Sequence, residues 1–150
     1  MFFSYIKFIF IEFMNELIEN SHLLSFPLFC VFVYFFILFF QSSVDKILNW
    51  NSELEWIKSH FGKSIFKSNI LLLFFTLTLL ELATAILCLL SIFNFFIKIY
   101  DPLPFFALFF NSCTLICLFL GQRVAKDYQG AVSISVYFII NLIGFFLLSI

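Results

Sequence analysis

The hydrophobic pattern of this chain is dominated by four long apolar runs separated by short polar segments. The runs cover about residues 22–41, 70–97, 103–121 and 130–150. An α-helix rises about 1.5 Å per residue, so about 20 apolar residues cross a hydrocarbon layer of roughly 30 Å. The pattern therefore predicts an all-α membrane protein, with four transmembrane helices in an antiparallel up-down bundle and residues 1–150 as a single domain.

Two shorter helices are predicted beside the four spans. Residues 2–19 place Lys7 and three glutamates on one side of a helix, which is typical of an amphipathic helix at the membrane interface. The same residues can instead extend the first span. Within the loop 42–69, the sequence NSELEWIKSHFG predicts a short interfacial helix over about 52–61, because its apolar side chains form one stripe and its tryptophan favours the headgroup region.

Composition agrees with a membrane location. Hydrophobic residues make up 63% and charged residues 11% of the chain, whereas a soluble domain carries about 25% charged residues. The lipid bilayer is therefore the first expected partner. The net charge of −1 suggests no nucleic-acid partner. The four cysteines fall in apolar segments without CxxC or Cys/His metal spacing, so no metal site is expected.

Lysine and arginine are distributed unevenly between the two ends of the spans. Loops 42–69 and 122–129 together hold six of these residues, and the opposite side holds only Lys7 and Lys98. Because short cytoplasmic loops carry the excess of positive charge, we expect both long loops in the cytoplasm and both termini outside.

Each span carries a few polar residues, and these coincide in depth. Counted from the cytoplasmic ends, Glu81, Asn111 and Asn141 all lie about 15–17 Å deep. A second layer at about 10–12 Å holds Tyr34, Thr78, Thr114 and Tyr137. We therefore expect a buried polar site in the bundle interior, with Glu81 pointing toward both asparagines and phenylalanine facing lipid.

Two roles for Glu81 remain open at this point. An ionised acid at mid-membrane costs about 2.5–3.5 kcal/mol even on a lenient insertion scale, and burial disfavours the charged form. Lys46 and Arg123 belong to the membrane face from which the depth of Glu81 is counted, and we expect both to lie about 16 Å above Glu81. The functional interpretation is a protonatable group lining a pocket for a quinone headgroup or a proton. The structural interpretation is a neutral, hydrogen-bonded acid that fixes helix packing.

A charged cluster is expected at the cytoplasmic interface, formed by the end of the first span and the segment GQRVAKDYQG. Its members are Asp45, Lys46, Arg123, Lys126, Asp127 and Tyr128. One interpretation is a solvated turn whose cations snorkel to the surface. The other is a lid over the polar interior, in which Asp127 pairs with Arg123 or Lys46.

Three segments of the chain resemble the DoxX-like membrane family. FQSSVDKILNW has Lys46 at the family's lysine position, and LLELATAILCLLSIF has Glu81 at its acid. LFLGQRVAKDYQGAV is similar to a loop in a subset of members from Bacteroidota-type bacteria. Small residues stand where the family has glycine, namely Ser43, Ala85 and Ser91. The resemblance, over roughly residues 25–148, implies a four-helix protein of the bacterial inner membrane, so that the outward termini are periplasmic. Some members of the family are quinone-linked oxidoreductase subunits.

These observations favour a small, non-catalytic accessory subunit of a larger membrane complex. The sequence shows no cofactor motif, no cysteine pair and no sizeable soluble domain, so no catalytic residue is assigned and other membrane-protein subunits are the expected partners. The alternative is a quinone- or proton-handling component of a membrane oxidoreductase that uses Glu81, with quinone as its cofactor. A small-solute transporter is a weaker third hypothesis, because four helices leave little room for alternating access.

Overall fold

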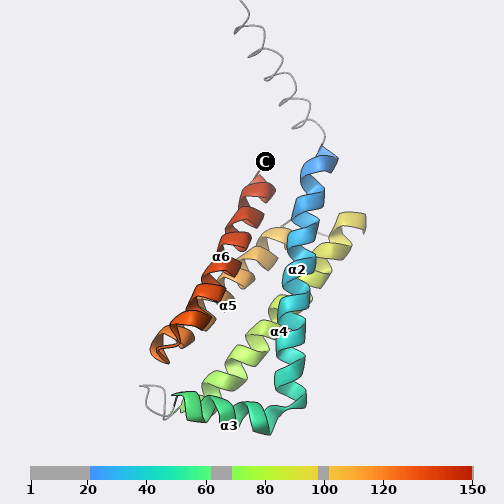
Figure 1. Ribbon diagram of the computed structural model, residues 1–150. Helices are drawn as coiled ribbons and strands as arrows, with labels where there is room; N and C mark the ends of the chain where they lie inside the picture. Colours follow the sequence, from blue (N-terminus) through green and yellow to red (C-terminus); the bar gives the residue numbers. More distant parts are fainter. Residues whose placement is uncertain (1–20, 62–68, 98–101, 150) are drawn as a thin grey trace, which may run out of the picture.

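The computed structural model describes residues 21–61, 69–97 and 102–149, and these residues are almost entirely helical (Figure 1). The helices are α2 (Ser21–Leu48), α3 (Trp50–Phe61), α4 (Ile70–Ile97), α5 (Leu103–Val124) and α6 (Tyr128–Ser149). Four of them, all but α3, are long and apolar enough to cross a membrane. The prediction of a helical, multi-pass membrane protein is therefore confirmed. The amphipathic helix predicted over 2–19 lies outside the described residues.

The helix ends differ from the predicted spans mainly where polar residues continue a helix. The span predicted over 70–97 coincides with α4, but α2 runs seven residues beyond Gln41. Its last turns contain serine, aspartate and lysine, which resemble a loop in composition and yet remain helical. α3 follows after the single residue Asn49 and begins two residues earlier than predicted. These extra turns of α2 carry two of the residues of the candidate site.

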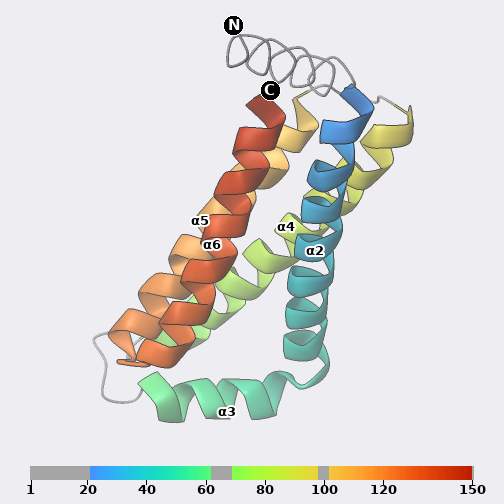
Figure 2. The ribbon, with the colours of Figure 1, turned by 45° about the horizontal axis from the view of Figure 1, so that its top comes forward.

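The four long helices pack in chain order, and the last of them also meets the first. α2 packs along α4, α4 along α5 and α5 along α6, while α2 meets α6 over a shorter stretch. Figures 1 and 2 show α4 crossing α2 diagonally, with α5 and α6 side by side. In both views α3 lies across the end of the molecule where α2 ends and α4 begins, and the turn between α5 and α6 lies at this same end.

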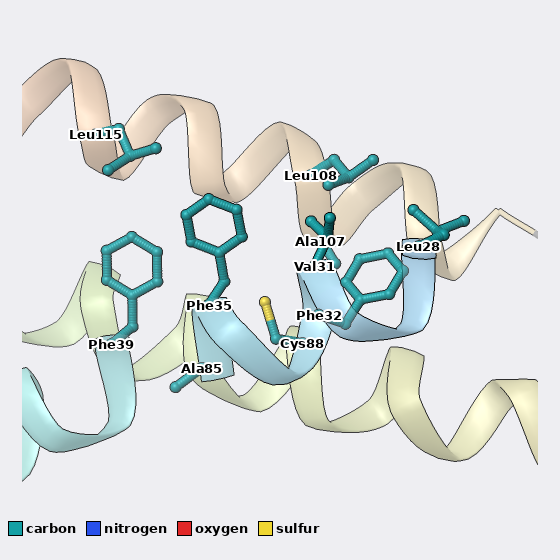
Figure 3. Close-up of a cluster of buried hydrophobic side chains, with 10 residues drawn as sticks. All are labelled: Leu28, Val31, Phe32, Phe35, Phe39, Ala85, Cys88, Ala107, Leu108 and Leu115. Carbon is teal, nitrogen blue, oxygen red and sulfur yellow. The ribbon is translucent and has the colours of Figure 1, made fainter. Parts of the chain in front are cut away.

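Phenylalanine fills part of the interior, contrary to the prediction that it faces lipid. Phe32, Phe35 and Phe39 of α2 are almost completely buried and project between α4 and α5 (Figure 3). They meet small residues on the facing helices, such as Ala85 and Cys88 of α4. A helix face of small side chains leaves a volume that large rings fill at the usual packing density. Many other phenylalanines, especially on α4 and α5, are exposed on the outer surface.

The apolar stripe of α3 is used for packing against α4. Leu54 is buried in a small cluster with Ile70 and Phe74, and Trp50 and Ile57 pack at its edge. The ring centroids of Trp50 and Phe74 are 4.6 Å apart. α3 is therefore anchored to the first turns of α4 by side-chain contacts, independently of any contact with lipid.

The turn between α5 and α6 is tight, and Asp127 takes part in it through both its backbone amide and its carboxylate. The amide of Asp127 donates to the carbonyl of Gln122 at 2.9 Å and that of Lys126 to the carbonyl of Arg123 at 3.2 Å. This pattern ends a helix through a left-handed residue, and Lys126 has φ 62°. The carboxylate of Asp127 then accepts the amide of Gly130 at 2.9 Å, which caps the start of α6. A Cβ at Gly130 would lie 2.6 Å from that carboxylate, so any side chain there would displace the capping group.

Replacing Asp127 by alanine should lower the free energy of unfolding by about 1 kcal/mol, because the first turn of α6 loses its cap. The measurement is unfolding in mixed detergent micelles followed by circular dichroism. Asp127→Asn is the matched control, since an asparagine oxygen can accept the same amide hydrogen bond. Equal destabilisation by both variants would contradict the capping role.

Candidate functional site

A buried ion pair joins α2 to α4. The Glu81 side chain is fully buried, and its two oxygens accept hydrogen bonds from Lys46 Nζ at 2.9 and 2.7 Å. Ser42 Oγ donates to Glu81 Oε2 at 3.1 Å and accepts from Lys46 Nζ at 2.7 Å. The three hydrogens of the ammonium group therefore each have an acceptor. We call Ser42, Lys46 and Glu81 the ion-pair triad.

The local structure of α2 explains how Lys46 reaches into the span. Ser42 and Lys46 are four residues apart on α2 and so lie on the same helix face. Helical side chains point back toward the N-terminus, which carries the ammonium group from the last turn of α2 toward Ser42. The 14% exposure of the Lys46 side chain shows that most of this stem is covered. The triad is therefore built from an ordinary i, i+4 pair on one helix and a single acid on the next.

The prediction that Lys46 lies about 16 Å above Glu81 is wrong. That estimate ended the first span at Gln41 and treated the spans as parallel to one another. α2 instead continues to Leu48, and α4 crosses it diagonally (Figure 2). Both effects bring the last turns of α2 to the level of Glu81. The acid is therefore paired with a cation.

The chemistry available to Glu81 is restricted by its two partners. Charge-assisted hydrogen bonds from Lys46 and Ser42 offset the cost of burying the carboxylate. The hollows on the described part of the chain include a groove of about 310 Å³ between α3, α4 and α5 and one of about 340 Å³ between α5 and α6. Glu81 lines neither of them, and their linings are almost entirely apolar. The geometry thus favours a structural acid over one that faces a ligand pocket.

A series of polar contacts continues along α4 beyond the triad. Thr84 and Thr114 share a hydrogen bond of 2.8 Å between α4 and α5. One turn further, Cys88 Sγ donates to Asn111 Oδ1 at 3.4 Å. Cys88 is seven residues past Glu81, which is about 10 Å along the helix axis. The expectation that Glu81 points toward Asn111 is therefore not met, since the partners of Glu81 come from α2 and Asn111 contacts a different turn of α4.

Asn141 holds α6 against α5. Its Nδ2 donates to the Leu108 carbonyl at 3.1 Å and to Ser112 Oγ at 2.7 Å. Ser112 Oγ itself donates to the Leu108 carbonyl at 3.1 Å. Both asparagines are fully buried, as predicted, but Asn141 contacts α5 and makes none of the described hydrogen bonds of Glu81.

The second predicted layer does not form one site. Thr78 is buried but donates to the Phe74 carbonyl of its own helix at 2.8 Å. Thr114 contacts Thr84, as described above. Tyr34 and Tyr137 do meet, with ring centroids 6.1 Å apart between α2 and α6, but 37% of Tyr34 is exposed. Serine and threonine in a helix can bond their own backbone, which is why depth alone did not predict the partners.

The predicted interfacial cluster is divided between two places. Lys46 belongs to the ion-pair triad, and Asp45 is exposed on α2. At the α5–α6 turn, the Arg123 guanidinium carbon lies 4.8 Å from the ring centroid of Tyr128, and the Asp127 carboxylate caps α6. The pairing of Asp127 with Lys46 is therefore wrong, because all three ammonium hydrogens of Lys46 have other acceptors. The alternative, a lid in which Asp127 pairs with Arg123, stays a prediction.

Three hydrogen-bond partners of the predicted site residues were missed from the sequence, namely Ser42, Thr84 and Ser112. A spacing signal exists for the first two. Ser42 precedes Lys46 by four residues and Thr84 follows Glu81 by three, so each shares a helix face with a residue that was singled out. For Ser112 no such signal is present, because its role depends on where α6 lies.

Comparison with protein-family models, with curated proteins and with solved structures finds no match to this chain. Among residues 21–61, 69–97 and 102–149, no three histidine, cysteine, aspartate or glutamate side chains are grouped so that they could hold a metal ion.

Proposed function

We propose that this chain is a small, non-catalytic accessory subunit of a larger membrane complex, and a DoxX-like protein of the bacterial inner membrane. The observation that carries the proposal is the ion-pair triad. Both oxygens of Glu81 are engaged by Lys46 and Ser42, so the membrane-embedded acid serves to join α2 to α4. A subunit whose task is to hold a fixed surface in the membrane needs this kind of internal cross-link.

The DoxX-like assignment is supported by where the resembling segments meet. FQSSVDKILNW contributes Ser42 and Lys46, and LLELATAILCLLSIF contributes Glu81. Two segments far apart in the chain thus supply one contact. The small residues Ser43 and Ala85, which stand at glycine positions of the family, are fully buried. For orientation we propose cytoplasmic loops at the α3 end and periplasmic termini, from the lysine and arginine distribution.

The proposed subunit contact is the outer face of α6, which is less buried within the protein than the other three spans. Exposed apolar side chains follow one another at spacings of four and three residues, namely Val132, Val136, Ile139, Ile143 and Phe146, each 49–64% exposed. A 4-3 spacing forms one seam along a helix and suits packing against a second helix. The partner is therefore an apolar transmembrane helix of another membrane protein.

The test is purification of the tagged chain from its native membranes in a mild detergent. A stoichiometric companion membrane protein should co-purify with the unaltered chain. Ile139→Trp places a large ring in the proposed seam and should release the companion. Ile86→Trp is the matched control, because Ile86 is similarly exposed on α4, and it should retain the companion.

Two results would count against the proposal, at different levels. A chain that runs as a monomer without any companion overturns the accessory-subunit function. A companion that is retained by Ile139→Trp and released by Ile86→Trp leaves the function standing and moves the contact surface from α6 to α4.

A further inference from the structure

Two buried amide atoms in the middle of the bundle have no hydrogen-bond partner among the described residues. They are Asn111 Nδ2 on α5 and Asn141 Oδ1 on α6. Both side chains are fully buried, so neither atom can reach water at the membrane surface. Lipid chains offer no hydrogen bonds, and an unsatisfied polar group in the hydrocarbon region is costly. One atom is a donor and the other an acceptor.

The orientation of the Asn141 amide is determined by its neighbours. The Leu108 carbonyl can only accept, so the atom facing it at 3.1 Å must be Nδ2. The hydroxyl proton of Ser112 goes to this same carbonyl, which leaves Ser112 Oγ as the acceptor for the second Nδ2 hydrogen at 2.7 Å. Both hydrogens of the amide are thereby used. Asn141 Oδ1 consequently needs a donor from elsewhere.

Asn111 presents such a donor on the same turn of α5. It lies between Leu108 and Ser112 in the sequence, the two residues that Asn141 contacts. Its Oδ1 already accepts the Cys88 thiol, so Nδ2 keeps its hydrogens available. The two asparagines are each held by other contacts and make no direct hydrogen bond to one another in the structure.

We propose that a single buried water molecule binds between these residues, accepting a hydrogen bond from Asn111 Nδ2 and donating one to Asn141 Oδ1. A water molecule satisfies a donor and an acceptor at once, and buried waters typically make two to four hydrogen bonds. The surroundings argue against a larger ligand. Leu108, whose carbonyl Asn141 contacts, is fully buried, and a Cβ at Gly144 would lie only 2.8 Å from Leu108.

The site goes beyond the proposed subunit function, because it places water inside the membrane-spanning region without any role for a partner protein. It also links three helices. Cys88 of α4 contacts Asn111 of α5, and the water joins Asn111 to Asn141 of α6. The polar contacts that begin at the ion-pair triad therefore extend as far as α6.

The test is water-edited solid-state NMR of the whole protein in bilayers, with ¹⁵N in the asparagine side chains. In the unaltered chain, magnetisation should pass from water to Asn111 Nδ2 as rapidly as to an amide in contact with solvent. Asn141→Leu should abolish most of this transfer, because the water loses its acceptor. Ser112→Ala is the matched control. It removes another partner of Asn141 but keeps Oδ1, so the transfer should persist.

The NMR measurement on the unaltered chain is enough to overturn the proposal, so the outcome does not depend on whether the variants fold. Absence of transfer to Asn111 Nδ2 would exclude the water. A direct hydrogen bond between the two asparagine side chains, detected as a through-space contact without water, would also exclude it. A high-resolution structure from a lipidic phase that shows an organic headgroup between the asparagines would replace water by a different ligand.

Discussion

Replacing Lys46 by methionine should destabilise the protein by about 3–5 kcal/mol, because the Glu81 carboxylate is then left buried without its cation. Methionine keeps the length and most of the apolar stem of lysine, so lost packing contributes little. The free energy of unfolding, measured by steric trapping or by titration with SDS in mixed micelles, reports this loss directly.

The double variant Lys46→Met/Glu81→Met should regain most of the lost stability, since replacing both members of a buried ion pair by apolar groups is often neutral or favourable. Ser42→Ala is the matched single change. It removes a hydrogen bond to a charged group, worth roughly 1.5–3 kcal/mol, and leaves the ion pair in place. A double variant that is no more stable than Lys46→Met would show that the two side chains do not depend on each other.

Gly144→Leu should separate α6 from the rest of the bundle. A Cβ at Gly144 would already lie 2.8 Å from Leu108 Cδ2 and 3.1 Å from Val31 Cγ1, so a leucine cannot fit without moving the helix. Overpacking a core usually costs about 1–3 kcal/mol. Here the displacement also threatens the hydrogen bonds that Asn141 makes to α5 one turn away, so we expect the upper end of that range, about 3 kcal/mol.

Ile143→Leu is the control for this prediction, because Ile143 is the neighbouring residue and 49% of it is exposed. It should leave the unfolding free energy nearly unchanged. Gly144→Ala should lie between the two, since the closest atoms are ends of side chains that can shift. If Gly144→Leu unfolds no more easily than Ile143→Leu, the close packing of α6 on α5 and α2 is absent.

The positions of the spans could be predicted from hydropathy because membrane thickness requires long apolar runs. Residues 70–97 illustrate this, since both ends of α4 are marked by polar residues outside the run. The end of α2 could not be found in the same way. Ser42 and Lys46 are polar in the sequence, and only the position of α4 shows that they face a buried acid.

The burial of the three central polar residues was predicted better than their contacts. Glu81, Asn111 and Asn141 are all fully buried, as their inward stripes indicate. Their partners depend on the tilt of α4 and on the rotation of α6, which no residue count records. Thr114 shows the same limit, because spacing places Thr84 on the face of Glu81 but does not show that the two threonines meet.

One residue, Asn49, separates α2 from α3. A connection this short does not let the two helices move independently of each other. α3 is attached to the first turns of α4 through Leu54. It therefore connects the end of α2 to the start of α4 at one end of the molecule. A displacement of α3 would therefore act on the last turn of α2, where the Lys46 side chain begins. The geometry of the buried ion pair is in this way coupled to the position of α3.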